Sequence, residues 1–442
     1  MASNTKQAKN SSADRISNLP DSLVILILSL LPFNLAVQTS LLSKRWRPLY
    51  LSLSNLRFSD SNGNKSGPQF IDSVDRFLVH RENNLDVKEL GLNCAGDYDH
   101  TRVDMWISQA LDHNVKCMSL EFRFNSGLYK LIPDMYTYEM FEVLRFKWQI
   151  LVDIPDDFYF SRLKVLEFCY VTFSSYECVK EILLECPVLE DLVIKKCRWL
   201  SGHRLTVCGS ELRNLTLKCN EWSHGQKRLK IVIDTPELET LKITDSTLAD
   251  IYVKDPLENI ITAHISVGVV RMQMRDSLFE LLDNIYDVEC LTLTDKAVGA
   301  LDGVSDYDLP IFHNLVKLVL RVDNWSCWEL LPNILASSPN LESLLLPWGV
   351  DLAQTSEQYV CGLWRQPTVV PECLSSHLQT IEFGSFSGTE DEFLLAEYLL
   401  MYGKALRKVS IYCSESKLES RIRKKLLRFG RGSKSCKIDF IN

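Results

Sequence analysis

The residue types that carry out catalysis or hold metal ions are present in this sequence, but their spacing matches no reactive arrangement. Eight His are scattered along the chain, and none pairs with a Cys or Asp at a metal-ligand spacing. There is no Gly-rich phosphate loop, no C-x-x-C and no H-E-x-x-H. A Cys–His nucleophile stays open, because its two members need not be neighbours in sequence. We therefore expect no catalytic residue, no metal and no cofactor.

Six cysteines are spaced almost evenly: Cys169, Cys178, Cys186, Cys197, Cys208 and Cys219. Metal ligation is one interpretation, but the six positions coincide with apolar strand and helix patterns, which favours packing. The chain has 14 Cys, without a secretion signal or a small Cys-dense unit. Reduced thiols in a cytoplasmic or nuclear protein are the prediction.

Bulk composition excludes several classes of partner. The 442 residues suffice for two or three domains or for one long repeat array. A net charge of −8 disfavours binding to nucleic acid. No apolar run reaches the roughly 18 residues that a membrane span needs. We expect neither a nucleic-acid nor a membrane partner.

The elements that could position a binding surface begin with an apolar run between Pro20 and Pro32. Residues 23–31 read Leu-Val-Ile-Leu-Ile-Leu-Ser-Leu-Leu, so a helix over them is apolar on nearly every face. Such a helix needs cover on more than one side, and we expect a partner protein to supply part of it. Asp21 or Ser22 is the expected N-cap.

Two shorter helices are predicted to follow. Asn34 is expected to cap one of them, and Ser43 is expected to cap another over residues 44–50, in which Trp46 is a large anchor flanked by cations. The alternative is an independent three-helix domain with every apolar side chain inside. So short a chain buries too little surface for that.

Three segments share their spacing with a known family: Asp14-Arg15-Ile16-Ser17-x-Leu19-Pro20-Asp21-x-Leu23, Ile27-Leu28-Ser29-x-Leu31-Pro32 and Ala36-Val37-x-Thr39-Ser40-x-Leu42-Ser43-Lys44-Arg45-Trp46-Arg47. Together they resemble the F-box of plant-type F-box proteins. The resemblance implies docking on a Skp-type adaptor and, through it, on a cullin in an SCF ubiquitin ligase. The positions that correspond to adaptor contacts are Leu19, Pro20, Leu23, Ile27, Leu31, Pro32, Val37, Leu42, Ser43 and Trp46.

Beyond residue 84 the pattern apolar-x-x-apolar-x-apolar recurs at intervals of 22–28 residues, with one interval of 37. This period is typical of leucine-rich repeats. The units start at Val87, Val115, Phe141, Leu163, Leu189, Leu212, Leu238, Ile260, Val288, Leu315, Leu341, Leu378 and Leu406.

Each unit is predicted to form a short strand with alternating faces. In the unit at Leu189, Leu192 and Ile194 face inward and Val193 outward, and a helix such as residues 176–184 covers the inner face. One unit cannot bury that face alone, so the units stack into a curved solenoid. Unrelated strands in a mixed α/β domain are the alternative.

A second resemblance covers residues 358–440. Its residues are Trp364-x-x-Pro367, Val370-Pro371-x-Cys373-Leu374, Leu378-x-Thr380-Ile381, Phe386-x-Gly388-x-Glu390-x-Glu392, Ala396-x-Tyr398-Leu399-Leu400 and Ala405-Leu406. They resemble the FBD domain of plant F-box/leucine-rich-repeat proteins, which implies no chemistry. We expect two repeat-like strands with a helix over residues 390–401 between them, closing the open end of the solenoid.

A tail helix over residues 417–429 carries Arg421, Arg423, Lys424, Lys425 and Arg428. These residues are interpreted as a solvated helix face, with a nuclear-import or anion-binding patch as the alternative.

The predicted fold class is therefore α/β: a three-helix F-box, an irregular leucine-rich-repeat solenoid and a C-terminal FBD cap. The predicted ranges are a disordered leader at 1–13, the F-box at 14–58, a linker and capping helix at 59–84, the solenoid at 85–350, and the FBD domain and tail at 351–442.

Target capture is expected on the concave strand face, to which the third, fifth and seventh positions of each unit point. Five cations at these positions, Lys195, Lys218, Lys242, Lys317 and Arg321, outnumber the acids Glu167 and Asp191. They would favour an acidic or phosphorylated segment of an unknown protein target. Ordinary solvated strand residues are the alternative.

The sequence thus favours a non-catalytic substrate receptor of an SCF-type ligase. A repeat scaffold or regulator with a weak or unused F-box is the alternative, and a small-molecule sensor is a more remote one.

Overall fold

The computed structural model describes residues 16, 18–60, 67–79, 85–125, 127–219, 229–245, 250–267, 272–294, 297–298, 301, 309–321, 330–347, 364, 366–413 and 416–441. The predicted leader at 1–13 lies outside these residues, as do most of the predicted linker and most of the insert that causes the interval of 37 residues.

The chain begins with short helices. They are α1 (Asp21–Ser29), α2 (Phe33–Gln38) and α3 (Trp46–Leu49), with the 3-10 turns η1 (Thr39–Leu41) and η2 (Tyr50–Ser52). Pro20 and Pro32 occupy the N-cap positions of α1 and α2, so the predicted caps by Asp21, Ser22 and Asn34 are wrong. Proline pre-sets the backbone before a helix and needs no side-chain cap there. The Ser43 hydroxyl does accept a hydrogen bond from the Trp46 N–H at 3.3 Å.

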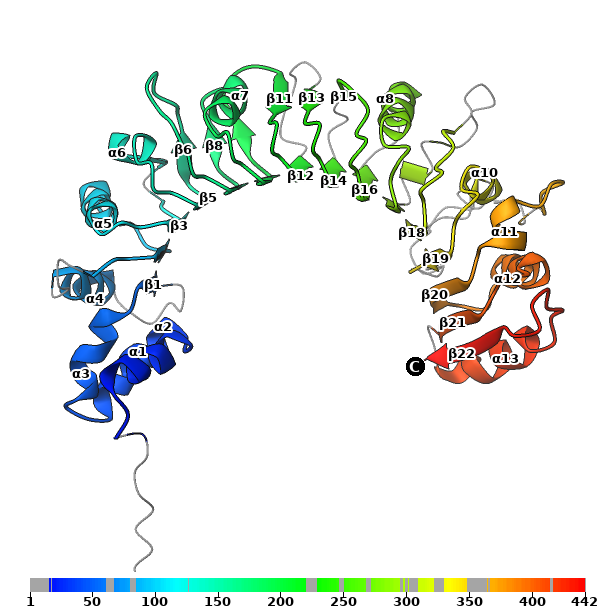
Figure 1. Ribbon diagram of the computed structural model, residues 1–442, viewed down its shortest axis with the longest axis horizontal. Coiled ribbons are helices and arrows are strands. Elements are labelled where there is room, and N and C mark those ends of the chain that lie inside the picture. The colour runs from blue at the N-terminus through cyan, green and yellow to red at the C-terminus, as the bar shows by residue number, and fades with distance from the viewer. Residues whose placement is uncertain are drawn as a thin grey trace, which may run out of the picture.

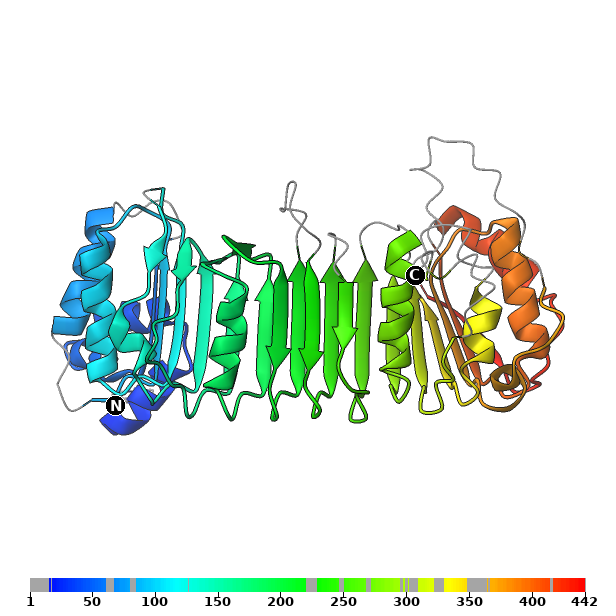
Figure 2. The same cartoon turned by 90° about the horizontal axis from the view of Figure 1, so that it is seen from above.

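A single parallel sheet then runs the length of the molecule. Its strands, neighbours in this order, are β1 (Asn55–Ser59), β2 (Glu89–Cys94), β3 (Cys117–Phe122), β5 (Val143–Trp148), β7 (Val165–Cys169), β9 (Asp191–Lys195), β12 (Asn214–Cys219), β14 (Thr240–Asp245), β16 (Thr262–Val267), β17 (Cys290–Thr294), β18 (Lys317–Arg321), β19 (Ser343–Leu346), β20 (Thr380–Phe386), β21 (Lys408–Cys413) and β22 (Lys437–Ile441). Figure 1 shows the sheet bent into an arc, with strands on the inner side and helices on the outer side. Figure 2 shows the strands side by side.

Every predicted repeat start is followed by a strand of this sheet. The strands are in register, so that Leu192, Leu215 and Leu241 form one buried row, while the residues between the buried rows are less buried. The sequence reading missed both ends of the sheet. β1 contains Leu56 and Phe58, which with Leu53 fit the same pattern, and all of β1 except Ser59 lies in the range predicted for the F-box.

The outer layer differs from the expected run of helices. It holds α4 (Gly67–Val79), α5 (His100–Asp112), α6 (Pro133–Tyr136), α7 (Glu177–Leu184), α8 (Met272–Asp283), α10 (Leu331–Ala336), α11 (Glu372–Ser376), α12 (Glu390–Tyr402) and α13 (Ser416–Leu426). Two small parallel sheets stand beside them. One comprises β10 (Arg198–Trp199), β8 (Thr172–Phe173), β6 (Ile150–Val152) and β4 (Tyr129–Lys130), and the other β11 (Arg204–Cys208), β13 (Lys230–Asp234) and β15 (Asp250–Val253).

The small sheet of β11, β13 and β15 covers the main sheet between α7 and α8 (Figure 1). Ile231, Val232 and Ile233 of β13 are all buried, so this strand supplies the apolar cover expected from a helix. The helix predicted over residues 176–184 is confirmed as α7, with Val179, Ile182 and Leu183 buried.

The C-terminal part continues the main sheet. The predicted helix over residues 390–401 is α12, which follows β20 and precedes β21 along the chain as expected. The last strand, β22, was not predicted. The Thr389 side chain and Glu392 form a capping box at the start of α12. Arg423 and Lys425 of the tail helix lie 5.3 Å and 3.9 Å from the ring centroids of Phe440 and Phe393, so these two cations cover aromatic rings.

An aromatic cluster joins the first helices to the sheet. The Phe33 ring of α2 lies edge-on to Phe58 of β1 and to Phe77 of α4, with centroids 5.0 Å and 5.4 Å away. These contacts fix the N-terminal helices against the first repeat.

Candidate protein-interaction surfaces

Helix α1 buries only part of its apolar surface. Val24 and Leu28 are fully buried, whereas Leu23, Leu26 and Leu30 are 45%, 57% and 79% exposed. The exposed residues recur at i, i+3 and i+7, which places them along one stripe of the helix. We call Leu23, Leu26, Ile27, Leu30 and Leu31 the α1 stripe. So large an aliphatic surface in water is typical of a protein-binding site.

The ten positions that correspond to adaptor contacts differ in accessibility. Pro20, Leu23, Ile27, Leu31, Pro32, Leu42 and Ser43 are exposed, and Leu19 and Val37 are half-buried. Trp46 is 9% exposed and packs in the hydrophobic core. The sequence reading missed Leu26, Leu30, Leu35 and Leu41, which are all exposed. Helical spacing from Leu23 could have identified the first two.

Arg45, just before α3, contacts the residues at the start of α1. Its guanidinium forms an ion pair with the Asp21 carboxylate at 2.6 Å and donates a hydrogen bond to the Leu19 carbonyl. The start of α1 is therefore held against the chain just before α3, which keeps the α1 stripe in a defined orientation.

The five predicted cations all lie on the concave face. Lys195 and Lys218 stand directly opposite each other on β9 and β12, and Lys317 and Arg321 lie at the two ends of β18. None of the five forms an ion pair with another residue that the structure describes. The sequence reading missed His264, which lies directly opposite Lys242 on β16.

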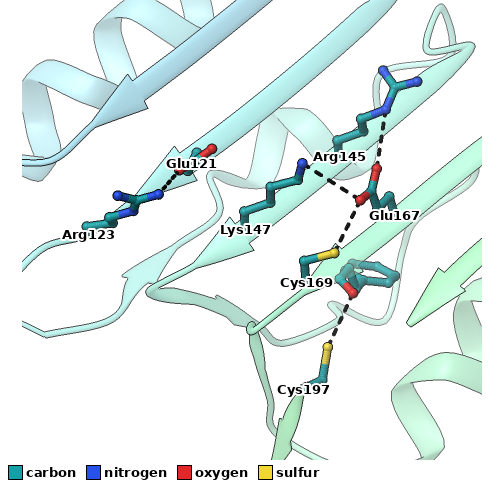
Figure 3. Close-up of polar contacts among 8 residues, drawn as sticks. Glu121, Arg123, Arg145, Lys147, Glu167, Cys169 and Cys197 are labelled. Carbon is teal, nitrogen blue, oxygen red and sulfur yellow. Dashed lines mark hydrogen bonds and ion pairs between the residues drawn. The ribbon is translucent and has the colours of Figure 1, made fainter. Parts of the chain in front are cut away.

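The concave face is neutralised nearer the N-terminus. Arg145 and Lys147 of β5 both point toward Glu167 of β7, with nitrogen–oxygen distances of 3.4 Å and 3.7 Å (Figure 3). Arg57 of β1 pairs with Glu89 of β2 at 2.6 Å. These three cations pair with acids on neighbouring strands, whereas the five predicted cations have no such partner among the described residues.

The thiols in this region are packing groups. The Cys169 thiol donates a hydrogen bond to Glu167 and that of Cys197 to the Phe168 carbonyl (Figure 3). Burial is the main reason that the pKa of Cys169 and that of Cys197 rise to about 12. A thiol with so high a pKa is a poor nucleophile near pH 7. The cysteines that the structure describes are all free.

A ladder of rings and cations lines one rim of the arc. Trp148 and Tyr170 stack with centroids 4.2 Å apart and an interplanar angle of 10°. Arg123 lies 5.1 Å from the Trp148 centroid, and Lys196 lies 5.4 Å from the Tyr170 centroid. We call these four residues the rim ladder. Each face of the two stacked rings is therefore occupied within the chain.

An open groove of about 560 Å³ lies at the opposite ends of the strands, lined by Glu142, Arg162, Lys164, Glu190 and Arg213 among others. Lys164 pairs with Glu190 at 2.8 Å, and Arg213 pairs with Glu239 at 2.5 Å. These charges are already balanced, which leaves the α1 stripe and the concave cations as the candidate surfaces. The described residues include no cluster of side chains suited to a metal ion. None of the described helices has the length and apolar character needed to cross a bilayer.

Comparison with known proteins divides the chain in the same way. A family model of the F-box domain matches residues 16–49, a model of the LRR repeats of FBD-associated F-box protein At5g56370 matches residues 103–264, and the FBD model matches residues 366–411. The probable FBD-associated F-box protein At1g32375 of Arabidopsis thaliana is 30% identical over 97% of this chain and 100% of its own length. The chain belongs to the F-box/FBD/LRR-repeat family.

Another relative in the family, the Arabidopsis thaliana F-box/FBD/LRR-repeat protein At4g26340, is 31% identical over 89% of this chain and 91% of its own length. The F-box match includes the whole α1 stripe and ends at Leu49, the last residue of α3. The LRR match includes Lys195, Lys218, Lys242 and His264. The FBD match begins before α11 and ends within β21. An F-box domain in general implies binding to a Skp-type adaptor.

Proposed function

We propose that this chain is a substrate-recognition subunit of an SCF-type cullin E3 ubiquitin ligase. The observation that carries the proposal is the α1 stripe, a row of exposed aliphatic side chains within the F-box. A Skp-type adaptor would bury this stripe and link the chain to a cullin. In this proposal Pro20, Leu42 and Ser43 join the stripe, and half-buried Leu19 and Val37 lie at its border.

The repeats supply the second half of the proposed function. The concave cations Lys195, Lys218, Lys242, Lys317 and Arg321 would bind a protein target of opposite charge. The receptor would then hold that target near the ubiquitin-charged enzyme that the cullin brings. Acceleration would come from proximity rather than from a catalytic side chain of this chain. The raised pKa values of Cys169 and Cys197 make these two thiols poor nucleophiles near pH 7.

The domain arrangement follows the same proposal. We assign α1, α2 and α3 to a three-helix F-box, the repeats to a solenoid, and β22 with α13 to an end cap in which Arg423 and Lys425 cover aromatic rings. The proposed ranges remain 14–58, 59–84, 85–350 and 351–442. The proposed location is the cytoplasm, the nucleus or both, with no nucleic-acid, membrane or cofactor partner.

The test is co-purification with a Skp-type adaptor. Leu23→Glu combined with Leu30→Glu places charges on the α1 stripe without touching the core, so retention of the adaptor should fall at least about tenfold. Leu200→Glu changes a leucine that is 64% exposed outside the F-box, and it should retain the adaptor as the wild type does. Equal retention by all three proteins would favour a repeat scaffold whose F-box is unused.

A further inference from the structure

The middle of the concave face carries positive charge that the described part of the chain does not balance. From β9 to β18, Asp191 is the one carboxylate among the described side chains at the third, fifth and seventh repeat positions. The same positions carry Lys195, Lys218, Lys242, His264, Lys317 and Arg321. Strands β5 and β7 of the same sheet provide an internal comparison, because there Arg145 and Lys147 both pair with Glu167.

Like charges stand close together in this region. Lys195 and Lys218 are directly opposite on adjacent strands, an arrangement that is unfavourable when no counter-charge is present. Strands of one sheet lie about 4.8 Å apart, so the positive charges of the two lysines repel each other. An anion bound on this face would remove that repulsion.

Lys242, His264 and Thr292 lie side by side on three adjacent strands near the centre of the region. Lys242 is directly opposite His264, and His264 is directly opposite Thr292 of β17. Burial is the main cause that lowers the pKa of His264, and the charges of Arg321 and Lys242 lower it further. Both cations therefore act on the same imidazole. Thr292 adds a hydroxyl between His264 and β18.

The geometry points to a phosphoryl-binding site formed by Lys242, His264 and Arg321, which holds a phosphorylated serine or threonine of the target. This assignment rests on the proposed function, in which the concave face binds a target segment. A phosphoryl monoester carries about −1.5 to −2 charges and three acceptor oxygens near pH 7. One oxygen can accept from Lys242, one from Arg321 and one from His264 or Thr292. A glutamate side chain offers one charge and two oxygens, so it leaves part of the cluster unpaired.

Binding at this site couples to protonation of His264. The groups that act on His264 are Lys242 on the adjacent strand β14 and Arg321 on β18, two strands away, which both favour the neutral ring. The adjacent strand β17 places uncharged Thr292 opposite His264. A bound dianion reverses the sign of the local field, so the pKa of His264 rises on binding. A merely structural histidine would keep its pKa when the probe is added.

The experiment uses the full-length chain with its histidines labelled with ¹⁵N, and His264→Gln identifies the signal of interest. The probe is the capped peptide Gly-Gly-phosphoserine-Gly-Gly, compared with the same peptide carrying serine or glutamate and with inorganic phosphate. The phosphopeptide should raise the pKa of His264 by about one unit, the glutamate peptide by less, and the serine peptide not at all. No shift with the phosphopeptide, or an equal shift with the glutamate peptide, overturns the assignment.

Two variants and one control locate the site. Lys242→Gln and Arg321→Gln should each weaken phosphopeptide binding about tenfold. Lys147→Gln removes a cation that already pairs with Glu167 on the same face, so binding should not change. Equal weakening by all three variants would show unspecific attraction and would also overturn the assignment. Adaptor co-purification is measured separately. If the wild-type chain binds the phosphopeptide but does not retain the adaptor, the proposed ligase role is rejected and the phosphoryl-binding site is still supported.

Discussion

Trp148 and Tyr170 stack face to face on adjacent repeats although both have left-handed backbones, with φ of 73° and 60°. Lys196, at the equivalent place in the next repeat, has φ of 53°. Glycine adopts this conformation without steric cost, whereas other residues are strained there. The rim ladder offsets that strain, because the left-handed turn aims each side chain onto its neighbour.

Removal of the ring at position 170 should therefore have two different costs. Tyr170→Ala loses the stacking and keeps the strain, whereas Tyr170→Gly loses the stacking and releases the strain. The alanine variant should be less stable than the glycine variant by about 1 kcal/mol, measured by chemical denaturation. If glycine is the more damaging of the two, the backbone at this position is not strained.

Leu28 of α1 and Leu30, the residue that caps its C-terminus, should separate folding from binding. Leu28 is fully buried and Leu30 is 79% exposed, although they lie two residues apart. Leu28→Ala should reduce stability by about 2–5 kcal/mol because it leaves a cavity. Leu30→Ala should leave the melting temperature unchanged and weaken adaptor binding. Thermal melting and adaptor co-purification of both variants test this division, and a destabilised Leu30→Ala protein would contradict it.

Gly384 of β20 should not tolerate a side chain. A Cβ at this position would lie 2.1 Å from the Pro347 carbonyl oxygen, so the backbone must move. Gly384→Ala should cost about 1–3 kcal/mol of stability. Gly430 is the matched control, because a Cβ there meets no described atom within 4 Å. Denaturation midpoints of the two variants would contradict this account if they were equal.

Reversal of the concave charges should abolish target capture without unfolding the repeats. Lys218→Glu, Lys242→Glu and Arg321→Glu together replace three cations by acids at accessible strand positions, and Lys218→Glu also relieves the repulsion with Lys195. Capture of partners from plant extract with the proteasome inhibited should fall at least about tenfold, and it should fall in wild type as salt is raised. Unchanged capture would reject the concave cations as the target site.

The pKa of His264 should respond to its two cationic neighbours. Burial, Arg321 and Lys242 all lower it, so Arg321→Gln should raise it toward, but not up to, the ordinary value. Because the folded-state pKa lies below the unfolded one, this residue stabilises the fold above the unfolded pKa of about 6.5 and loses that contribution as pH falls through the folded pKa. NMR titration of wild type and variant measures the shift. A pKa that falls in Arg321→Gln would contradict the assigned field.

The repeat positions were predictable because every second residue of each strand is buried and apolar. This alternation can be seen in a few consecutive residues of the sequence. Leu192 and Ile194 illustrate this rule. β1 was not predicted because its Leu56 and Phe58 follow directly after the F-box pattern. Two-residue strands such as β8 were not predicted because they are too short to show an alternation. The concave cations were predictable from position within the repeat. Whether a cation has an ion-pair partner was not predictable, because the partner lies on another repeat. Arg145, for example, pairs with Glu167, which is 22 residues away in the sequence.

The aromatic junction of Phe33, Phe58 and Phe77 has a mechanical consequence. The N-terminal helices pack on the first strand of a continuous sheet. Their position relative to the later strands is therefore set by the sheet and not by a flexible linker. In the proposed receptor, the position of a target bound beside Lys242 relative to an adaptor on the F-box would depend on the number of strands between Lys242 and β1. Insertion of one repeat between β9 and β12 would carry that docking point about 4.8 Å farther along the arc without altering a single contact residue.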